Sequence, residues 1–560
     1  MMDIYEEKQI QELPLSVPLF RKKVEDFLKA NGLRLEKVDV YMAIQNADEQ
    51  ILAGGGIAED TIKCIAVSEK ARSEGLAAPL VSRLIAIGAE RGYTNIKVFT
   101  KPENIAIFGS LGFRTLASAP KAVLMENGSG LKDYLDSMTP RSDSGIIIMN
   151  ANPFTIGHEY LIEKALEQVG HLFVIVVRED VSRFPYAERL ASVKAACAGL
   201  KKVTVCEGSS YQISAATFPT YFLKELTDAS ETQMRLDLDL FCRHIAPALG
   251  ATVRFVGSEP SDALTARYNA LMKEILPSNG IRVVEIPRYK NVSASAVREA
   301  LDAGHFAFAA SLVPATTVPS LLADRAAWAL RQELSLTGKP GLVGPDSPGA
   351  HSDMNYDLMN RGISAIRPYF YRLGTITTSS EIIPTGLEAE RAMLEATGGV
   401  NTHQGAIFSI GLMIFAVNPD FNWSLVPERI SLLAMKVPYT SRSHEWAVMG
   451  VKGPLALAIE GYKELFGDWL PYYRSVKDKQ NGMHKTLLHI MATLDDTCII
   501  RRAGLERARK VKDEAHTLLN NYSDAGMKAM NEEFCREGIS SGGAADMLAL
   551  TLFADSIEVK

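Results

Sequence analysis

The sequence has few of the features that mark specialised classes of protein. It contains six cysteines in 560 residues, and none of them forms a C-x-x-C pair. Neither a zinc site nor a disulfide framework is therefore indicated, and we expect free thiols in a reducing compartment. The longest apolar stretch, residues 405–417, is too short to span a bilayer and predicts a buried helix. Residues 1–11 are acidic and polar, unlike a secretory signal peptide. We expect a cytoplasmic protein with no membrane partner.

The chain also lacks a large excess of one charge. Its formal net charge is -6 at pH 7, with 22% charged and 47% hydrophobic residues. This balance is ordinary for a soluble globular protein. No basic stripe or aromatic platform stands out, so we expect no nucleic-acid partner, although a local basic cleft could still bind phosphates. The length corresponds to roughly three or four domains.

Two changes in composition divide the chain. Residues 127–145 are rich in Gly, Ser, Pro and charge, and near residues 314–319 a β-rich pattern gives way to helical periodicity. Strands that alternate with helices before this point indicate parallel sheets with crossover helices. We predict a multidomain α/β plus all-α fold with domains at 1–126, 143–318 and 322–560. The expected strands are 41–44, 61–67, 96–99, 145–149, 172–177, 203–205, 253–256 and 283–286, and the expected helices are 76–91, 160–169, 328–334, 407–415 and 508–519.

The first segment carries a possible pyrophosphate loop. R-x-x-G-x-A begins at Arg72 and opens a helix, where small residues and the helix N-terminus allow backbone N–H groups to approach a phosphate. Together with N-I-A-I-F from Asn104 and the G-F pair at 112–113, it resembles the GNAT acyltransferase family over about residues 40–115. The resemblance implies a GNAT-like α/β domain that binds a CoA-like arm through Arg72, Gly75, Ala77 and Asn104. A domain of this shape that binds no ligand remains an alternative.

The second segment carries two strings that each lie at a strand-to-helix junction. Strand 145–149 continues into N-A-N-P-F-T-I-G-H, residues 150–158, and V-S-A-S-A-V-R occupies residues 292–298. Helix N-termini, an imidazole and a hydroxyl can all donate to the charge that builds up when the α-phosphorus of ATP is attacked. These strings resemble the nucleotidylyltransferase superfamily, with its T-x-G-H and I-S-x-S/T-x-x-R signatures. The resemblance implies a Rossmann-like domain with Thr155 and His158 in catalysis. It also implies ATP contacts by Asn152, Gly157, His158, Arg189, Ser293, Ser295 and Arg298.

Further strings narrow this superfamily. They are F-P-Y-A-E-R at 184–189, S-A-A-T-F-P-T-Y-F-L-K at 214–224, F-V-G-S-E-P at 255–260, Y-N at 268–269 and V-P-A-T at 313–316. With the GNAT-like front they resemble the citrate lyase ligase family over about residues 1–320. The resemblance implies ATP- and acetate-dependent acetylation of the thiol of citrate lyase's acyl carrier protein subunit, with release of AMP and pyrophosphate. The second segment would make acetyl-AMP and the first would hold the thiol arm. A malonate-type carrier remains open as the client.

The third segment contains long and unusual strings. They are K-P-G-L-V at 339–343, G-A-H-S-D-M at 349–354, N-T-H-Q-G-A-I-F at 401–408, D-D-T at 495–497, R-R-A-G at 501–504 and S-S-G-G-A-A-D-M-L-A at 540–549. They resemble the triphosphoribosyl-dephospho-CoA synthase family over about residues 325–555. In that family the 2′-hydroxyl of the substrate dephospho-CoA displaces adenine from the ribose of ATP. Such a displacement needs an acid for the departing adenine and a base or metal for the hydroxyl.

The resemblance nominates residues for this chemistry. Asp353, Asp496 and Asp546 are candidates for the acid, the base and the ligands of Mg²⁺ bound with ATP, since carboxylates suit this ion. Each of these aspartates, taken alone, could instead be a helix cap or a surface charge. The candidates for contacts with phosphate or base are Lys339, His351, His403 and Arg502.

One stretch departs from the family pattern. Residues 452–462 read K-G-P-L-A-L-A-I-E-G-Y where the family carries an acidic stretch like K-G-A-R-G-E-A-E-A-G-F, and Ser541 replaces a proline. We therefore hold a bifunctional enzyme as the leading interpretation. The alternatives are a ligase with a non-catalytic C-terminal binding domain and an adenylyltransferase of cofactor biosynthesis.

Overall fold

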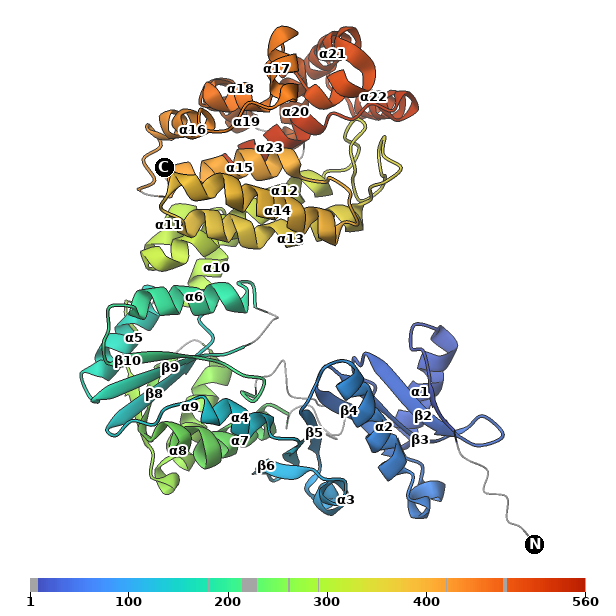
Figure 1. Cartoon of the computed structure of the whole chain (residues 1–560), viewed down its shortest axis with the longest axis vertical. Coiled ribbons are helices and arrows are strands. Elements are labelled where there is room, and N and C mark those ends of the chain that lie inside the picture. The colour runs from blue at the N-terminus through green and yellow to red at the C-terminus, as the bar shows by residue number, and fades with distance from the viewer. Residues whose placement is uncertain are drawn as a thin grey trace. The chain divides into compact units, whose positions relative to one another are not determined.

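The computed structural model describes residues 9–178, 182–213, 229–259, 262–290, 292–418, 420–476 and 481–558 (Figure 1). The chain divides into two compact units. One comprises Met1–Asn152 with Gly157–Asn291, and the other comprises Pro153–Ile156 with Val292–Lys560. The string at 214–224 and residue 260, which contribute to the resemblance to the ligase family, lie outside the described residues.

The N-terminal sheet of the first unit has seven strands in the order β1-β2-β3-β4-β5-β7-β6. Its strands are β1 (Ile10–Glu12), β2 (Val40–Gln45), β3 (Ile51–Ala58), β4 (Thr61–Val67), β5 (Ile96–Thr100), β6 (Arg114–Ala119) and β7 (Ala122–Asn127), with helices α1 (Pro18–Ala30), α2 (Ala77–Glu90), α3 (Ile105–Ser110) and α4 (Gly130–Asp136). Neighbouring strands are antiparallel except β4 and β5, so the parallel sheet predicted for this segment is wrong. These two pair only at Thr61 with Lys97 and Ile62 with Val98. The carboxyl ends of β4 and β5 are therefore not paired to each other.

Strand β3 was not predicted, because its centre reads Gly54-Gly55-Gly56. The glycines are required by close packing. A Cβ at Gly54 would lie 2.6 Å from the hydroxyl of Tyr41, and one at Gly56 would lie 2.7 Å from a methyl group of Val38. Glycine usually weakens a strand, so tertiary packing overrides local propensity here.

The second sheet of the first unit is fully parallel, as its strand–helix alternation predicted, with the order β10-β9-β8-β11-β12. Its strands are β8 (Ser144–Met149), β9 (His171–Val176), β10 (Val203–Glu207), β11 (Ala251–Gly257) and β12 (Arg282–Ile286). The helices of this region are α5 (Ile156–Leu166), α6 (Tyr186–Cys197), α7 (Ala229–Leu240), α8 (Ala246–Leu249) and α9 (Ala263–Ile275). The strand order reverses at β8, the position where α/β sheets of this kind bind ligands outside the carboxyl ends of their strands.

Polar contacts join the two sheets of the first unit. The ammonium of Lys97 on β5 donates to the carbonyl of Ser210 at 3.0 Å and pairs with Asp60. The hydroxyl of Tyr211 donates to Glu126 on β7. Burial and this carboxylate raise the pKa of Tyr211. Because buried polar groups are costly when unpaired, these partners fix the register of the contact.

All the regular secondary structure in the described residues of the second unit is helical. Its helices are α10 (Ala294–Asp302), α11 (Phe306–Ser311), α12 (Val318–Ser335), α13 (Tyr356–Thr375), α14 (Ile382–Ala396), α15 (Gln404–Val417), α16 (Val426–Ala434), α17 (Ser441–Val448), α18 (Pro454–Ile459), α19 (Leu470–Ser475), α20 (Gly482–Thr493), α21 (Thr497–Asn520), α22 (Asp524–Glu537) and α23 (Gly542–Ile557). Figure 1 shows α15 and α23 between α13 and α14 on one side and α19 and α20 on the other. Both are buried along most of their length.

The predicted buried helix at 405–417 is confirmed as α15. Throughout the part of the chain that the structure describes, no helix combines the length and the apolar character needed to cross a membrane.

Candidate functional sites

The T-x-G-H string lies where the topology favours a nucleotide. It follows β8, the central strand of the parallel sheet, and runs into α5. Thr155 is buried, whereas Gly157 and His158 are half-buried in the first turn of α5. The first N–H groups of a helix have no intrahelical partners, so this turn presents donors at the carboxyl edge of the sheet.

The imidazole of His158 is neutral at pH 7. Desolvation, together with the nearby guanidinium of Arg288, lowers the pKa of His158 to about 4. Arg288 follows β12 and pairs with Glu259, which follows β11. A neutral imidazole can donate one hydrogen bond to the charge that develops on the phosphate, without transferring its proton.

Arg189 supports the loop that precedes T-x-G-H. Its buried guanidinium on α6 donates to the carbonyls of Phe184 and Val177, at 3.0 and 2.9 Å, and to the backbone and side chain of Asn150. The side-chain oxygen of Asn152 accepts from the N–H of Phe184 at 3.1 Å. Arg189 was predicted to contact ATP. In the structure its guanidinium donates to protein carbonyls, which suits a residue that positions the loop, and its contact with ATP stays a prediction.

The second signature begins helix α10 in the helical unit. The hydroxyl of Ser293 accepts from the N–H of Ala296 at 3.0 Å, which makes Ser293 the N-cap of α10. The hydroxyl of Ser295 lies 3.0 Å from that of Ser293, and Arg298 is half-buried on the following turn. In the same unit the N–H of Ile156 donates to the carbonyl of Leu312 at 3.1 Å.

The predicted CoA-binding residues lie after β4 and β5, the two strands whose carboxyl ends are unpaired. Arg72 is exposed on a 3₁₀ turn that ends at Gly75, whose φ of 69° is left-handed, and Ala77 begins α2. Nothing lies within 4 Å of the Cβ position of Gly75. The side-chain amide of Asn104 donates to the hydroxyl of Thr100 at 2.9 Å, so this amide faces the end of β5. Arg72 and Asn104 therefore differ in how freely they can meet a ligand.

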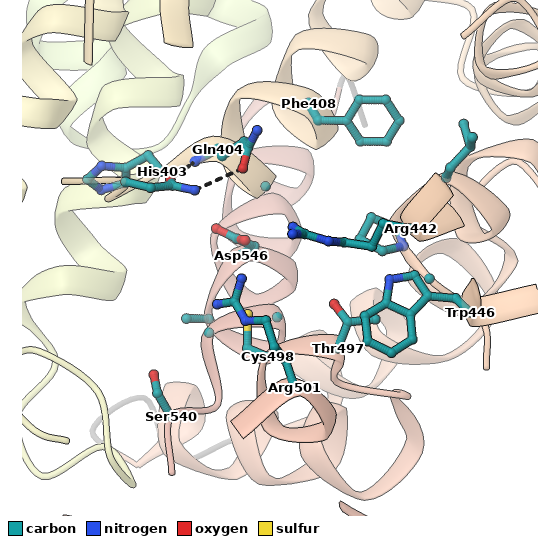
Figure 2. Close-up of a pocket in the computed structure, with 18 of the residues that line it drawn as sticks. His403, Gln404, Phe408, Arg442, Trp446, Thr497, Cys498, Arg501, Ser540 and Asp546 are labelled. Carbon is teal, nitrogen blue, oxygen red and sulfur yellow. Dashed lines mark hydrogen bonds between the residues drawn. The ribbon is translucent and has the colours of Figure 1, made fainter. Parts of the chain in front are cut away.

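A cavity of about 660 Å³ lies within the helical unit, a volume typical of small-molecule sites. Figure 2 shows the side chains that surround it. The lining comes from α12, α13, α14, α15, α17, α18, α21 and α23 and from loops between them. Most strings that carried the resemblance to the synthase family contribute to this lining. The polar and charged residues among the lining are Glu333, His351, Glu390, Asn401, Thr402, His403, Gln404, Thr440, Ser441, Arg442, Ser443, Thr497, Arg501, Arg502, Ser540 and Asp546.

Asp546 is the predicted carboxylate that faces this cavity. Burial and the nearby carboxylates of Glu333 and Asp496 raise the pKa of Asp546 well above its usual value. It accepts a hydrogen bond from the backbone N–H of Ala406. A Cβ at Gly405 would lie 2.0 Å from its Oδ2, so only glycine permits this approach. A carboxyl group whose pKa is raised holds its proton to higher pH, which favours a role as general acid.

Beneath Asp546 lies a buried ion pair that the sequence did not reveal. The ammonium of Lys339 donates to both the carbonyl and the carboxylate of Glu333, and the two side chains are only 1% and 8% exposed. Desolvation, together with the charge of Lys339, lowers the pKa of His403 to about 3. Lys339, predicted to contact phosphate, is not part of the cavity lining, whereas Glu333 is.

The side chain of Asp496 caps the starts of two helices. Its Oδ1 accepts from the N–H of Cys498 at 2.8 Å at the start of α21, and its Oδ2 accepts from the N–H of Ala544 at 2.9 Å at the start of α23. A Cβ at Gly543 would lie 2.9 Å from its Oδ1, which explains the second glycine of S-S-G-G. Asp353 is exposed and outside the lining of the cavity. The structure therefore separates the three aspartates that the sequence grouped.

Two neighbouring arginines play different parts. Arg502 donates to the carbonyl of Gly538 at 3.1 Å and lies 3.2 Å from Nδ1 of His351, whose Nε2 lies 2.9 Å from the hydroxyl of Ser540. Burial and Arg502 lower the pKa of His351, so its Nδ1 can accept from the guanidinium. Arg501, by contrast, lines the cavity, and no hydrogen bond or ion pair joins it to another described residue. Figure 2 shows Arg501 directed toward Asp546.

The apolar stretch that departs from the family pattern forms part of the wall. Leu455 and Leu457 on α18 are buried, and Leu455 and Ala456 line the cavity. The replaced proline is also accounted for, because the hydroxyl of Ser541 donates to the carbonyl of Pro340 at 3.0 Å. These substitutions are accommodated by packing and by a hydrogen bond.

Comparison with known proteins matches both regions. The family model of the citrate lyase ligase C-terminal domain matches residues 144–321. The family model of ATP:dephospho-CoA triphosphoribosyl transferase matches residues 319–437 and 450–560. The [citrate [pro-3S]-lyase] ligase of Escherichia coli (strain K12) is 42% identical over 312 residues, which cover 53% of this chain and 88% of the relative. The 2-(5''-triphosphoribosyl)-3'-dephosphocoenzyme-A synthase of Escherichia fergusonii is 31% identical over 286 residues, which cover 44% of this chain and 93% of the relative.

The chain belongs to both families. It is a fused enzyme with a ligase part in front and a synthase part behind. A solved structure from Klebsiella pneumoniae described as an acyl-CoA N-acyltransferase is also similar, with 17% identity over 21% of this chain and 95% of that chain and a TM-score of 0.19.

The ligase and synthase parts meet inside one helix. The two family matches overlap at residues 319–321, within α12 (Val318–Ser335). The buried guanidinium of Arg325 on α12 donates at 2.9 Å to the carbonyl of Leu301, which precedes the overlap. Glu333, further along the same helix, lines the cavity. The join is therefore a helix with contacts on both sides of the overlap.

Proposed function

We propose that the chain matures citrate lyase by two reactions. The ligase part acetylates the thiol of the prosthetic group on the acyl carrier protein subunit, using ATP and acetate and releasing AMP and pyrophosphate. The synthase part makes 2′-(5″-triphosphoribosyl)-3′-dephospho-CoA from ATP and dephospho-CoA and releases adenine. The membership of one chain in both families supports this pairing. A cytoplasmic location remains a prediction from composition.

In the ligase part, acetyl adenylate would form at the carboxyl edge of the parallel sheet. Thr155, Gly157 and His158 would contact the phosphates of ATP, with Ser293 and Arg298 as the second signature. Support comes from the place of T-x-G-H after β8, where the strand order reverses. Arg189 would act through the Asn150 loop that it holds.

The N-terminal region would then hold the thiol arm, with Arg72 and Gly75 nearest its phosphates. The exposed position of Arg72 after β4 supports this assignment. We therefore propose a division into three parts, with a GNAT-like region at 1–126, a nucleotidylyltransferase-like region at 143–318 and a synthase region at 322–560.

In the synthase part, Asp546 would be the acid. The bond between C1′ of ATP and adenine breaks, and adenine takes up the proton of Asp546 as it leaves. The 2′-hydroxyl of dephospho-CoA bonds to C1′ and gives up its proton to solvent, from which Asp546 is reprotonated. The raised pKa of Asp546 supports this role. Its place in a cavity with Arg442, Arg501 and Arg502, which suits a triphosphate, is the observation that carries the proposal.

The described residues do not fit a magnesium site held by the protein alone. Within those ranges no group of three His, Cys, Asp or Glu side chains is placed to hold a metal ion. Asp496 is engaged by backbone N–H groups and Glu333 by Lys339. Mg²⁺ would therefore enter with ATP, since this ion is commonly held largely by substrate phosphates and water.

The first test is direct. The purified full chain is incubated with ATP, Mg²⁺ and dephospho-CoA, and adenine is measured by chromatography. Acetate-dependent AMP formation is measured in a parallel incubation that contains the thiol form of the acyl carrier protein subunit. We expect adenine only when dephospho-CoA is present. Acetate-dependent AMP without any adenine would refute the synthase proposal and favour a C-terminal part that only binds. Adenine without AMP would refute the ligase proposal.

A further inference from the structure

One wall of the cavity comes from a segment that the synthase family model leaves unmatched. The two matched parts end at 437 and resume at 450. The twelve residues between them include α17 (Ser441–Val448), whose N-cap Thr440 accepts from the N–H of Ser443 at 3.1 Å. Eight residues of this segment line the cavity, from Pro438 to Ser443 together with Trp446 and Ala447. This wall is therefore a feature of the chain itself rather than of the matched family pattern.

Trp446 is held with its ring at the cavity. A Cβ at Gly453 would lie 3.0 Å from Cδ1 of Trp446, so the indole packs directly over that glycine. The N–H of Val451 donates to the carbonyl of Trp446 at 2.9 Å. The N–H of Lys452 donates to Asp495 at 3.1 Å, which ties this end of the segment to the D-D-T string. Figure 2 shows the indole beside Thr497, at the start of α21.

Arg442 lies one turn earlier on α17 and points the same way. Figure 2 shows its side chain extending across the cavity toward Asp546. No hydrogen bond or ion pair joins it to another described residue, which is also true of Arg501. A guanidinium that lines a cavity without a protein partner retains all its donors for an anionic ligand.

We propose that Arg442 and Trp446 form a clamp for an adenine nucleotide, which rests on the synthase function proposed above. The indole stacks on the purine base, and the guanidinium binds the phosphates of the same nucleotide. Both residues determine specificity: Trp446 selects a planar base and Arg442 selects a phosphate chain. ATP and dephospho-CoA share this chemistry, and the test below distinguishes them.

The test uses adenine release by the full chain, which reports on the synthase site alone. KM for ATP and KM for dephospho-CoA are measured, with tripolyphosphate as a competitive inhibitor. Trp446→Ala should raise KM for the clamped nucleotide about tenfold, the size expected for the loss of one stacked base, and Trp446→Phe should restore most of it. Arg442→Gln should also raise that KM about tenfold, because it removes charge-assisted hydrogen bonds.

Tripolyphosphate separates the two contacts. If ATP is the clamped nucleotide, Arg442→Gln should weaken inhibition by tripolyphosphate and Trp446→Ala should leave it unchanged, since this inhibitor has no base. If dephospho-CoA is clamped, its KM alone should rise. Glu445→Gln is the matched control on α17, because Glu445 is exposed and outside the lining; a long-range effect of charge would change its KM by a similar factor in the opposite direction.

Wild-type KM values in both Arg442→Gln and Trp446→Ala would overturn the clamp. Absence of adenine release from the wild-type chain would instead refute the synthase function itself, so the two failures are distinguishable.

Discussion

The ligase loop and the synthase cavity are built in opposite ways. The T-x-G-H site places its candidate groups on one continuous stretch after β8, where backbone N–H groups at a helix start supply donors. The cavity collects side chains from eight helices between residues 330 and 549. The first is encoded locally and the second depends on the packing of the whole bundle. Single substitutions should therefore affect chemistry in the first and chemistry or packing in the second, depending on the residue.

The largest effect should come from Asp546→Asn. Loss of the proposed acid should lower dephospho-CoA-dependent adenine release about a hundredfold or more, while acetate-dependent AMP formation stays at its wild-type rate. Both products are measured on the same preparation by chromatography. Asp513→Asn, at an exposed position outside the cavity lining, is the matched control. Wild-type adenine release in Asp546→Asn would remove the acid from this residue.

The reverse pattern is expected for His158→Ala. Removal of a donor to the transition state should lower acetate-dependent AMP formation about a hundredfold, with adenine release unchanged. An equal loss of both products would mean that the two sites are not independent.

Asp496→Ala should act on stability before chemistry. It removes the carboxylate that caps α21 and α23, which should lower the free energy of unfolding by on the order of 2 kcal/mol. Thermal unfolding measures this against Asp513→Asn, at an exposed position. Normal stability combined with lost adenine release in Asp496→Ala would make Asp496 a catalytic group instead.

A smaller effect is expected at the thiol arm. Arg72→Gln should slow acetylation of the carrier thiol about tenfold, because one phosphate contact is lost, and leave acetate-dependent ATP–pyrophosphate exchange intact. Arg83→Gln on α2, where Arg83 pairs with Glu90 at the surface, is the control. Loss of exchange in Arg72→Gln would contradict the division between the two sheets.

The smallest effect concerns pH. The pKa of His403 is about 3 in the folded chain against 6.5 in a model peptide, so the unfolded state binds the proton more readily. As the pH drops below about 6.5 toward 3, protonation of His403 in the unfolded chain lowers the free energy of unfolding, by about 1 kcal/mol at pH 6. Denaturant titrations at pH 7 and pH 6 should show this loss, and His403→Asn should reduce it. If the free energy of unfolding of His403→Asn still fell by the same amount from pH 7 to pH 6, other groups would cause the pH dependence.

Sequence predicted the parallel sheet well because its buried strands are continuous apolar runs. It missed β3, whose glycines are dictated by Tyr41 and Val38, and it missed β1, β6 and β7. In the site, motif strings pointed to Asp546 and Arg502 but gave no information on Glu333, Arg501, Arg442 or Trp446 as lining residues. These residues lie on α12, α17 and α21, which meet only through tertiary packing, and this leaves no local signal. Strings also could not separate a cap, Asp496, from a proposed acid, Asp546, because both lie at conspicuous helix starts.

Helix α12 gives the fusion an unusual join. Here the ligase and synthase parts are joined by a single helix in which the two family matches overlap. Deleting one residue from α12 would turn everything after it by about 100° and shift it by about 1.5 Å. Glu333 would then move relative to Arg325 and its anchor at Leu301. A change in the length of α12 between Arg325 and Glu333 would therefore change the position of the cavity wall relative to Leu301.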